Sequence, residues 1–459
     1  MLIFTPFRID DLMFAYQIKG SNLKMIKMFE NKTVVNTKSN KLGLIEKRLR
    51  MSSNLTIEQV ANYLNVSKGN LSEIENGKRI LKEEMFFKFI HRFYPNFDLS
   101  WSIVEETEKQ LDKLFYALAY WDSKQEDDVE KWMVENREHL LNSFACIYLT
   151  VLETYFSYRR SLNREDVDVL NSSEDFIQYL SPDIRALLLF NKGYMYMKNR
   201  IPTDLEKNTQ AIRIFETALK EMDGKRWSQL EGVIKANLAS AIAKDLSFQQ
   251  AFNIAEQAKS IFIKEANFLR LAGMYNNQAV YLSNFGQYER AIEIVNKLIL
   301  NKNTFRDKNI YDLGISNKIL FLIEWGHFDE ALQFIQDHRA EFSPRHPDNF
   351  IFEPYCLLRM GEEKACLIMI QSYRKFALGE EDEAFYALIK AVLSRNSDRV
   401  EKAKIKMYLV CRRMKNWGMM QVMLQTLAYF YKQTYQSGRL AEVYEWQIML
   451  HNHQIPDLC

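Results

Sequence analysis

Four asparagines recur at places where an amide side chain could bind the backbone of another peptide. Asn237, Asn277 and Asn317 lie 40 residues apart, and Asn191 takes the corresponding place in an earlier segment. An asparagine amide offers both a donor and an acceptor, so it can bind the N–H and the C=O of an extended peptide. A row of such amides would hold a peptide backbone whatever its sequence. The alternative is that they form hydrogen bonds between neighbouring helices and keep those helices in register.

Side chains one helical turn away from these asparagines would then select among peptides. Residues three, four or seven positions apart lie on the same face of a helix. Asn237 has the small apolar neighbours Ile234 and Ala241. The neighbours of Asn277 and Asn317 are apolar or aromatic, with one carboxylate among them, and they are Met274, Tyr281, Leu313, Phe321 and Glu324.

The sequence lacks the motifs of common enzymes and metal sites. It has no GxxxxGK[ST], HExxH or GxSxG segment, and its seven histidines are scattered along the chain. The five cysteines are odd in number and lack CxxC spacing, which favours a reducing cytosol. We therefore expect a cytoplasmic protein with no catalytic activity, no cofactor and no metal.

The asparagines belong to a repeat of about 40 residues. Four alanines, Ala211, Ala251, Ala291 and Ala331, are spaced by 40, and a Gly-x-Tyr/Phe-x-x-Ala segment ends at each of the last two. Small alanines let two antiparallel helices pack closely, and a single pair cannot bury its apolar face alone. The pattern therefore predicts stacked helical hairpins. It resembles the tetratricopeptide repeat over residues 181–450, and we expect degenerate helical repeats over residues 106–180.

Composition and charge agree with an all-α chain that has a basic head. Glycine and proline contribute only 15 and 8 of the 459 residues, which argues against sheets joined by tight turns. No apolar run approaches the roughly 18 residues that a membrane helix needs. Residues 19–82 contain 13 Lys and Arg residues against five Glu and no Asp, although the whole chain has a net charge of only +2. Such a distribution is typical of a chain whose head alone meets a polyanion.

Three short amphipathic segments within residues 41–82 explain this basic head. Thr56 and Ser67 stand where a hydroxyl could cap a helix, and only Asn65 and Val66 separate the second segment from the third. The pattern Leu-Thr, Val-Ala, Val-Ser, Leu-Ser, Ile-Glu and Gly over residues 55–77 resembles the Xre or lambda-repressor type of helix-turn-helix. Ile57 departs from it, because the family often has a phosphate-contacting glutamine there.

This resemblance implies that the third segment reads DNA in the major groove. Asn70 would pair with adenine and Glu73 would accept from cytosine, unless Glu73 only pairs with a neighbouring lysine. The residues expected at the DNA are all on or just after that segment, and they are Ser67, Lys68, Gly69, Asn70, Glu73, Lys78 and Arg79. A chain with one such module normally forms a homodimer that reads two half-sites.

The order of the parts resembles the RRNPP superfamily of cytosolic peptide-pheromone receptors. We expect an extension at residues 1–40, the head at 41–82, a linker helix at 83–105 and then the repeats. The resemblance implies a transcriptional regulator in quorum sensing, whose repeats bind a short signalling peptide that controls operator binding. Two alternatives are a protein-interaction scaffold anchored to DNA, and a regulator that acts on a phosphorylated signalling protein.

Overall fold

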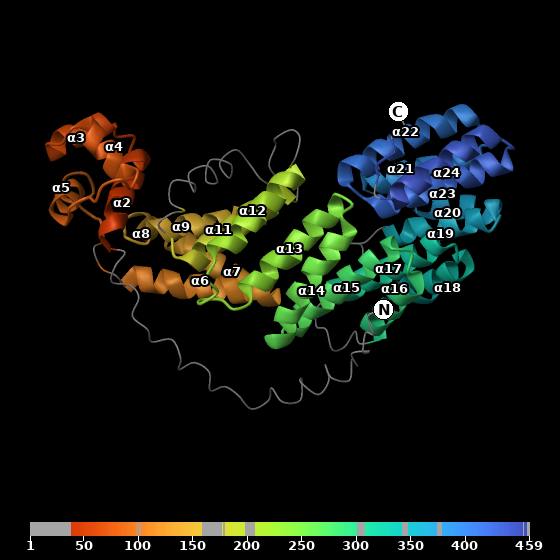
Figure 1. The fold of residues 1–459 in the computed structure, drawn as a ribbon, viewed down its shortest axis with the longest axis horizontal. Coiled ribbons are helices and arrows are strands. Elements are labelled where there is room, and N and C mark those ends of the chain that lie inside the picture. Colours follow the sequence, from red (N-terminus) through yellow and green to blue (C-terminus); the bar gives the residue numbers. More distant parts are fainter. Residues whose placement is uncertain are drawn as a thin grey trace. The chain divides into compact units, whose positions relative to one another are not determined.

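The fold is all-α with an N-terminal helix-turn-helix, as the sequence predicts (Figure 1). The computed structural model describes residues 38–157 apart from 99 and 101, residues 177, 180–197, 207–300, 308–341, 348–373 and 379–456 apart from 453. Most of the predicted extension, residues 1–37, lies outside this part. Among the described residues no strand forms, and a single bridge joins Asp98 to Ser143. None of the described helices is both long enough and apolar enough to span a membrane.

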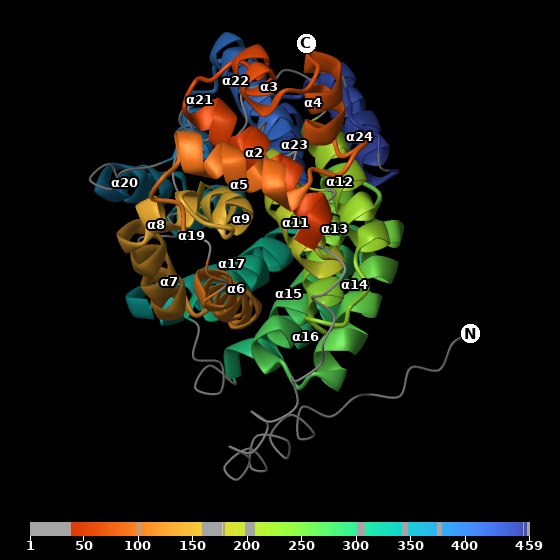
Figure 2. The same cartoon turned by 90° about the vertical axis from the view of Figure 1, so that its left-hand side faces the viewer.

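The chain divides into two compact units, Met1–Leu238 and Ala239–Cys459. The first unit begins with the head, a group of four helices, and Figure 2 shows two of them, α2 and α5, beside α9 of the bundle that follows. The helices of the head are α2 (Lys38–Ser52), α3 (Ile57–Leu64), α4 (Lys68–Glu75) and α5 (Glu83–Phe93).

The head is longer than the sequence indicates. Residues 83–93 were expected to start a linker helix, but Phe86, Phe89 and Ile90 of α5 are buried, and α5 packs on α2 and α3. Helices α2 and α4 approach so closely that a Cβ at Gly43 would come within 2.8 Å of the Ile74 carbonyl oxygen. The fourth helix is therefore part of the core of the head.

A bundle of four helices follows the head in the first unit. These are α6 (Ser102–Tyr120), α7 (Ser123–Glu135), α8 (Arg137–Leu141) and α9 (Cys146–Ser157). Leu44 of α2 packs against Ile147 of α9, and the Phe86 ring stacks on Phe144 with ring centroids 5.9 Å apart. The head and this bundle therefore share an apolar contact.

Helical hairpins make up the rest of the described chain. The first unit contains α11 (Pro182–Met197) and α12 (Lys207–Glu221), and α13 (Leu230–Lys244) crosses into the second unit. In the second unit the helices follow one another as α14 (Phe248–Lys264), α15 (Phe268–Asn284), α16 (Tyr288–Leu300), α17 (Lys308–Trp325), α18 (Phe328–His338), α19 (Asp348–Arg359), α20 (Glu363–Tyr373), α21 (Glu380–Leu393), α22 (Ser397–Met414), α23 (Trp417–Gln433) and α24 (Ser437–His451).

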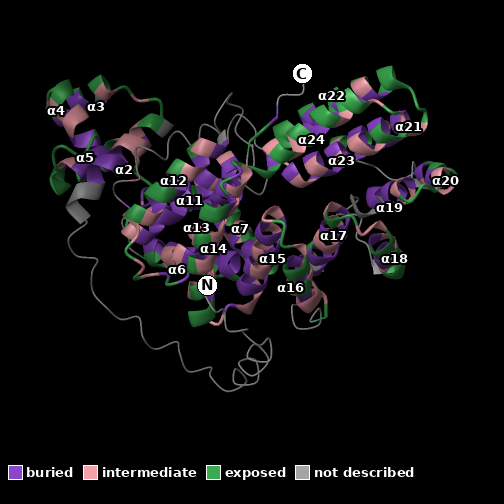
Figure 3. Ribbon diagram, turned by 45° about the vertical axis from the view of Figure 1, so that its right-hand side comes forward, coloured by how far each residue is buried: buried purple, intermediate pink, exposed green. Residues whose placement is uncertain are grey.

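The repeat residues take the places that the period predicts. Ala211, Ala251, Ala291 and Ala331 are all fully buried. Figure 3 shows buried and exposed residues side by side along the helices of the hairpins. The turns at Gly286, Gly326 and Gly361 have φ values of +72°, +92° and +84°, a left-handed conformation that glycine adopts without a steric penalty. The turn before α14 places Leu246 in the same conformation, with φ of +62°.

Candidate functional site

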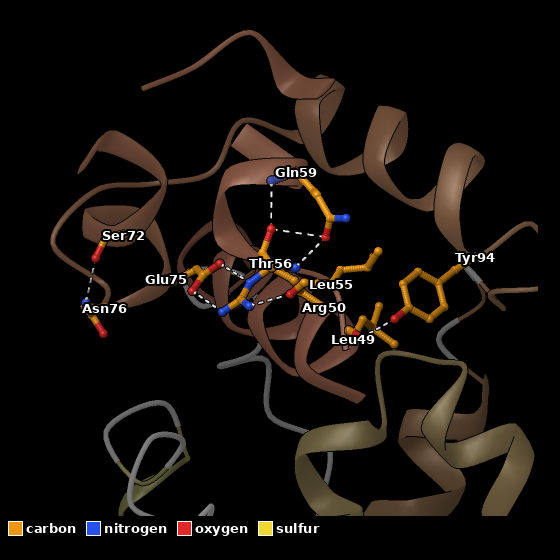
Figure 4. A network of polar contacts seen from close by, with 9 residues as sticks. All are labelled: Leu49, Arg50, Leu55, Thr56, Gln59, Ser72, Glu75, Asn76 and Tyr94. Carbon is orange, nitrogen blue, oxygen red and sulfur yellow. Dashed lines mark hydrogen bonds and ion pairs between the residues drawn. The ribbon is translucent and has the colours of Figure 1, made fainter. Parts of the chain in front are cut away.

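Local capping sets the geometry of the helix-turn-helix. The Thr56 hydroxyl accepts a hydrogen bond from the Gln59 N–H at 3.2 Å, and the Gln59 side-chain oxygen accepts one from the Thr56 N–H at 2.8 Å (Figure 4). Asn65 ends α3 in the left-handed region with φ of 55°. The Ser67 hydroxyl then caps α4 by accepting from the Asn70 N–H at 3.1 Å. Both predicted caps are present, and together they fix the short turn between α3 and α4.

A buried ion pair holds α2 against the end of α4. The Arg50 guanidinium donates to both carboxylate oxygens of Glu75, at 2.6 and 2.8 Å, and to the Leu55 carbonyl oxygen at 2.8 Å (Figure 4). Glu46 lies beside this pair and is fully buried. Burial, together with the negative charge of Glu75, raises the pKa of Glu46 to about 9. The Glu46 carboxyl is therefore neutral at physiological pH.

The predicted DNA-reading residues lie on one exposed surface of the head, formed by α4 and the turn after it. The side chains of Ser67, Lys68, Lys78 and Arg79 are exposed, and nothing lies within 4 Å of a Cβ built at Gly69. This surface is therefore open, and it has three cationic side chains that could contact phosphates.

The two side chains expected to read bases share one arginine. The Arg79 guanidinium donates to the Asn70 side-chain oxygen at 3.2 Å and forms an ion pair with Glu73 at 2.6 Å. The partner of Glu73 is thus Arg79, six residues away, and not the neighbouring lysine that the sequence suggests. Because the Arg79 and Glu73 side chains are 61% and 45% exposed, this pair contributes little to stability, about 0–1 kcal/mol. The three groups can therefore separate when a ligand approaches.

A cavity of about 410 Å³ lies in the second unit, and every residue that lines it belongs to that unit. Most of its wall comes from the first helix of successive hairpins. These are the end of α13, then α15, α17, α19, α21 and the start of α23. Its apolar part includes Phe248, Phe321, Phe352 and Trp417. Amide, hydroxyl and charged groups lie between these rings, so the cavity suits a ligand with both polar and apolar groups.

Four of the predicted peptide contacts line this cavity: Leu313, Asn317, Phe321 and Glu324. The others predicted in the same unit are not among its lining residues: Ala241, Met274, Asn277 and Tyr281. Of these, Ala241, Met274 and Tyr281 are buried in the core. In the first unit, the Asn237 side chain donates to the Val233 carbonyl oxygen of its own helix at 2.9 Å, and Asn191 is fully buried. Of the four asparagines, Asn317 alone therefore lines the cavity.

Asn317 combines the two roles that the sequence leaves open. Its side-chain amide donates to the Asn276 side-chain oxygen on α15 at 2.9 Å, which is an inter-helix hydrogen bond. The same side chain lines the cavity, where its oxygen can accept from a ligand. Asn284, also in the wall, donates to the Val280 carbonyl oxygen at 2.8 Å, so its oxygen likewise remains as an acceptor for a ligand.

A second register of the repeat, which is not among the predicted contacts, points to the cavity. Lys244, Asn284 and Glu324 are 40 residues apart, and all three line the cavity. Ser240, Val280 and Leu320 form another such set, one helical turn earlier, and they line it as well. Comparing polar residues at equal offsets in all registers of the repeat would have found Asn284 and Lys244.

Glu324 is the carboxylate that stands out in the wall. Burial alone raises its pKa to about 8. The other two carboxylates accept hydrogen bonds, Glu381 from the Asn416 side chain at 3.0 Å and Asp382 from the Gly379 N–H at 3.2 Å. Lys415 forms an ion pair with Asp245. Most charged groups in the wall are thus already used in holding helices together.

Comparisons with known proteins give a sequence match for the head and a structural match over most of the chain. Residues 47–93 match the helix-turn-helix family model, which ends at the last residue of α5. No curated protein matches. A Rap protein complexed with competence and sporulation factor has a similar structure, with a TM-score of 0.59 and 14% identity over 75% of this chain and 97% of that one.

Two further solved structures have the same fold. The apo form of RapI aligns with a TM-score of 0.54 and 14% identity over 77% of this chain and 99% of that one. NprR in complex with its cognate peptide NprX aligns with a TM-score of 0.51 and 15% identity, over 72% of this chain and 98% of that one. The predicted resemblance therefore holds for the head in sequence and for the repeats in fold.

Proposed function

We propose that this chain is a cytoplasmic DNA-binding regulator whose repeats bind a short signalling peptide that controls operator binding. The observation that carries the proposal is the cavity on the first helices of the hairpins, in a chain that begins with a helix-turn-helix. Two of the solved structures with this fold are complexes, one with competence and sporulation factor and one with the peptide NprX.

The cavity supports a peptide in preference to a small apolar ligand. Asn284 and Asn317 line it, and their side-chain oxygens could accept from backbone N–H groups of a peptide. Ser240, Ser283 and Ser316 add hydroxyls to the wall. Aromatic walls beside these groups would take apolar side chains of the peptide. This is how a groove binds a backbone through main-chain hydrogen bonds and selects sequence through adjacent pockets.

Control of DNA binding requires that the peptide prefers one arrangement of the chain. A ligand with equal affinity for two states shifts nothing, however tightly it binds. A single helix-turn-helix reads one half-site, so we propose that two copies of the chain bind a two-fold operator. The peptide would then change the spacing or the angle of the two heads and so change operator affinity, as expected for quorum sensing.

The experiment is a thermal-shift screen of the full chain against a pool of synthetic peptides of five to eight residues. Peptides that raise the melting temperature are then titrated against Asn317→Ala, which should weaken binding by about 1–3 kcal/mol because a buried hydrogen bond is lost. Asn253→Ala, on the exposed surface of α14, is the control and should bind as the wild type does. A pool without any hit, with DNA binding intact, would favour the protein-interaction scaffold.

A further inference from the structure

The cavity leaves one acidic side chain without a protein partner. In the described part of the second unit, the Glu324 carboxylate forms no hydrogen bond and no ion pair. Lys244 and Lys415, the two cationic side chains in the wall, both interact with other groups of the chain. Tyr288 on α16, whose ring stacks on Trp325, is the group whose titration Glu324 influences. The carboxylate is therefore available to a ligand.

Desolvation without compensation is costly for a carboxylate. A buried charge is normally paired or hydrogen bonded, because moving it out of water costs several kcal/mol. At Glu324 this cost disfavours the ionised carboxylate, so burial raises the pKa of Glu324 to about 8. A cation placed beside the carboxylate would offset that cost, whereas an anionic group would add to it.

The surroundings of Glu324 have room for such a group. Position 418, at the start of α23, is a glycine, and a Cβ there would lie 3.2 Å from the Glu324 Oε1 atom and 3.0 Å from the Leu320 Cδ2 atom. On that side α23 therefore packs closely against the carboxylate, and the room for a ligand is in the cavity of about 410 Å³ that Glu324 lines. Phe321 and Trp417 line the same cavity and could pack along an aliphatic stem.

We propose that the signalling peptide carries a cationic group, a Lys or Arg side chain or its own amino terminus, which forms an ion pair with Glu324. The inference rests on the proposed function and names the class of peptide that the cavity takes. Asn284 and Asn317 would hold the peptide backbone, and Glu324 would provide the charge selection. A charge-assisted hydrogen bond in a buried site is stronger than a neutral one and discriminates well against uncharged peptides.

The experiment compares matched peptides on the full-length chain by isothermal titration calorimetry. A peptide that binds in the thermal-shift screen is synthesised in three forms: unchanged, with each Lys or Arg replaced by norleucine or citrulline, and with an acetylated amino terminus. We expect one of the two neutralised forms to bind about tenfold more weakly than the unchanged peptide, since a tenfold change is only about 1.4 kcal/mol. The form that loses affinity identifies the source of the cation.

Two variants connect that loss to the carboxylate. Glu324→Gln should bind all three forms with similar affinities, whereas Glu289→Gln, an exposed carboxylate on α16, should keep the tenfold preference. Melting curves check that Glu324→Gln is folded, and we expect it to be at least as stable as the wild type because a partly buried carboxyl is removed. A wild-type chain that binds neutral and cationic peptides equally would overturn this inference but leave the proposed function standing. A wild-type chain that binds no peptide would overturn both.

Discussion

At the scale of single residues, charge placement explains why the head has one defined geometry. Arg50 donates two hydrogen bonds to Glu75 and a third to a backbone carbonyl, so α2, the turn before α3 and α4 are tied together. Because the pair is buried, removing either partner would leave an uncompensated charge in the core. Glu46 adds a second carboxyl beside the same arginine, and it is stable there only in its protonated form.

Glu46 makes the stability of the head depend on pH. In the unfolded chain its pKa is near the ordinary value of 4.5, and in the folded chain it is about 9. Between these values the folded state binds one more proton, so stability falls as pH rises, by up to about 1.4 kcal/mol per pH unit. Glu46→Gln should remove this dependence.

Urea unfolding of both chains at pH 6 and pH 8 measures the effect. Glu46→Gln should gain stability over the wild type on going from pH 6 to pH 8, because the glutamine has no proton to lose. Glu84→Gln, exposed on α5, should show no such gain. A wild-type chain and a Glu46→Gln chain with parallel pH profiles would show that Glu46 is not protonated in the fold.

Substitutions on the exposed surface of α4 and the turn after it should distinguish side chains that read bases from side chains that bind phosphates. Asn70→Ala should relax the preference for one base and cost about 1–3 kcal/mol on the preferred duplex. Lys78→Ala should weaken binding to all duplexes alike and reduce the salt dependence. Duplexes selected from a random library, followed by anisotropy titrations at several salt concentrations, distinguish the two patterns. Lys88→Ala on α5 serves as the control, and equal effects of Asn70→Ala on all duplexes would refute its role in reading bases.

At the scale of elements, the turns of the hairpins show how one backbone geometry is met by different residues. Gly286 and Gly326 take the left-handed conformation without strain, but Leu246 and Tyr435 take it as well, with φ of 62° and 55°. For an L-residue with a Cβ this conformation is less favourable by roughly 1–2 kcal/mol. Repeats before and after those two therefore keep the shape of the turn without a glycine.

Tyr435→Gly should stabilise the second unit. Tyr435 is 92% exposed, so the substitution loses little buried area, and glycine removes the steric penalty at φ of 55°. We expect a gain of about 0.5–1 kcal/mol, since the conformational entropy of glycine offsets part of the benefit. Gly286→Ala, at φ of +72° with open space around it, should lose a similar amount. Thermal unfolding of the two variants tests this, and a lower melting temperature for Tyr435→Gly would contradict it.

Local patterns predict the elements better than the site. The caps at Thr56 and Ser67 and the buried alanines depend on neighbours a few residues away, so the sequence predicts them. The end of the head was missed because the apolar face of α5 looks the same whether it packs on the head or on the next helix. Glu381 and Asp382 reach the cavity wall through the packing of α21, and nothing in their local sequence indicates it.

At the scale of the whole molecule, the proposed regulator needs a route from the cavity to the DNA. The described contacts provide one part of it, because Leu44 and Phe86 of the head make apolar contacts with Ile147 and Phe144 of the bundle after it. In addition, the Arg48 guanidinium on α2 donates a hydrogen bond to the Thr150 hydroxyl on α9. Movement of α9 would therefore move α2, and with it the helix-turn-helix. A peptide in the second unit controls DNA only if its binding biases such a movement.

The most direct measurement is the affinity of the full-length chain for a selected, fluorescently labelled duplex, with and without a saturating peptide from the screen. Fluorescence anisotropy gives the two dissociation constants under the same salt conditions. We predict that they differ by at least about fivefold, the lower end of typical coupling between two sites. The same peptide should have a smaller effect on duplex binding by the Asn317→Ala variant at that concentration. Equal dissociation constants, with calorimetry showing the peptide bound, would contradict peptide control of DNA binding.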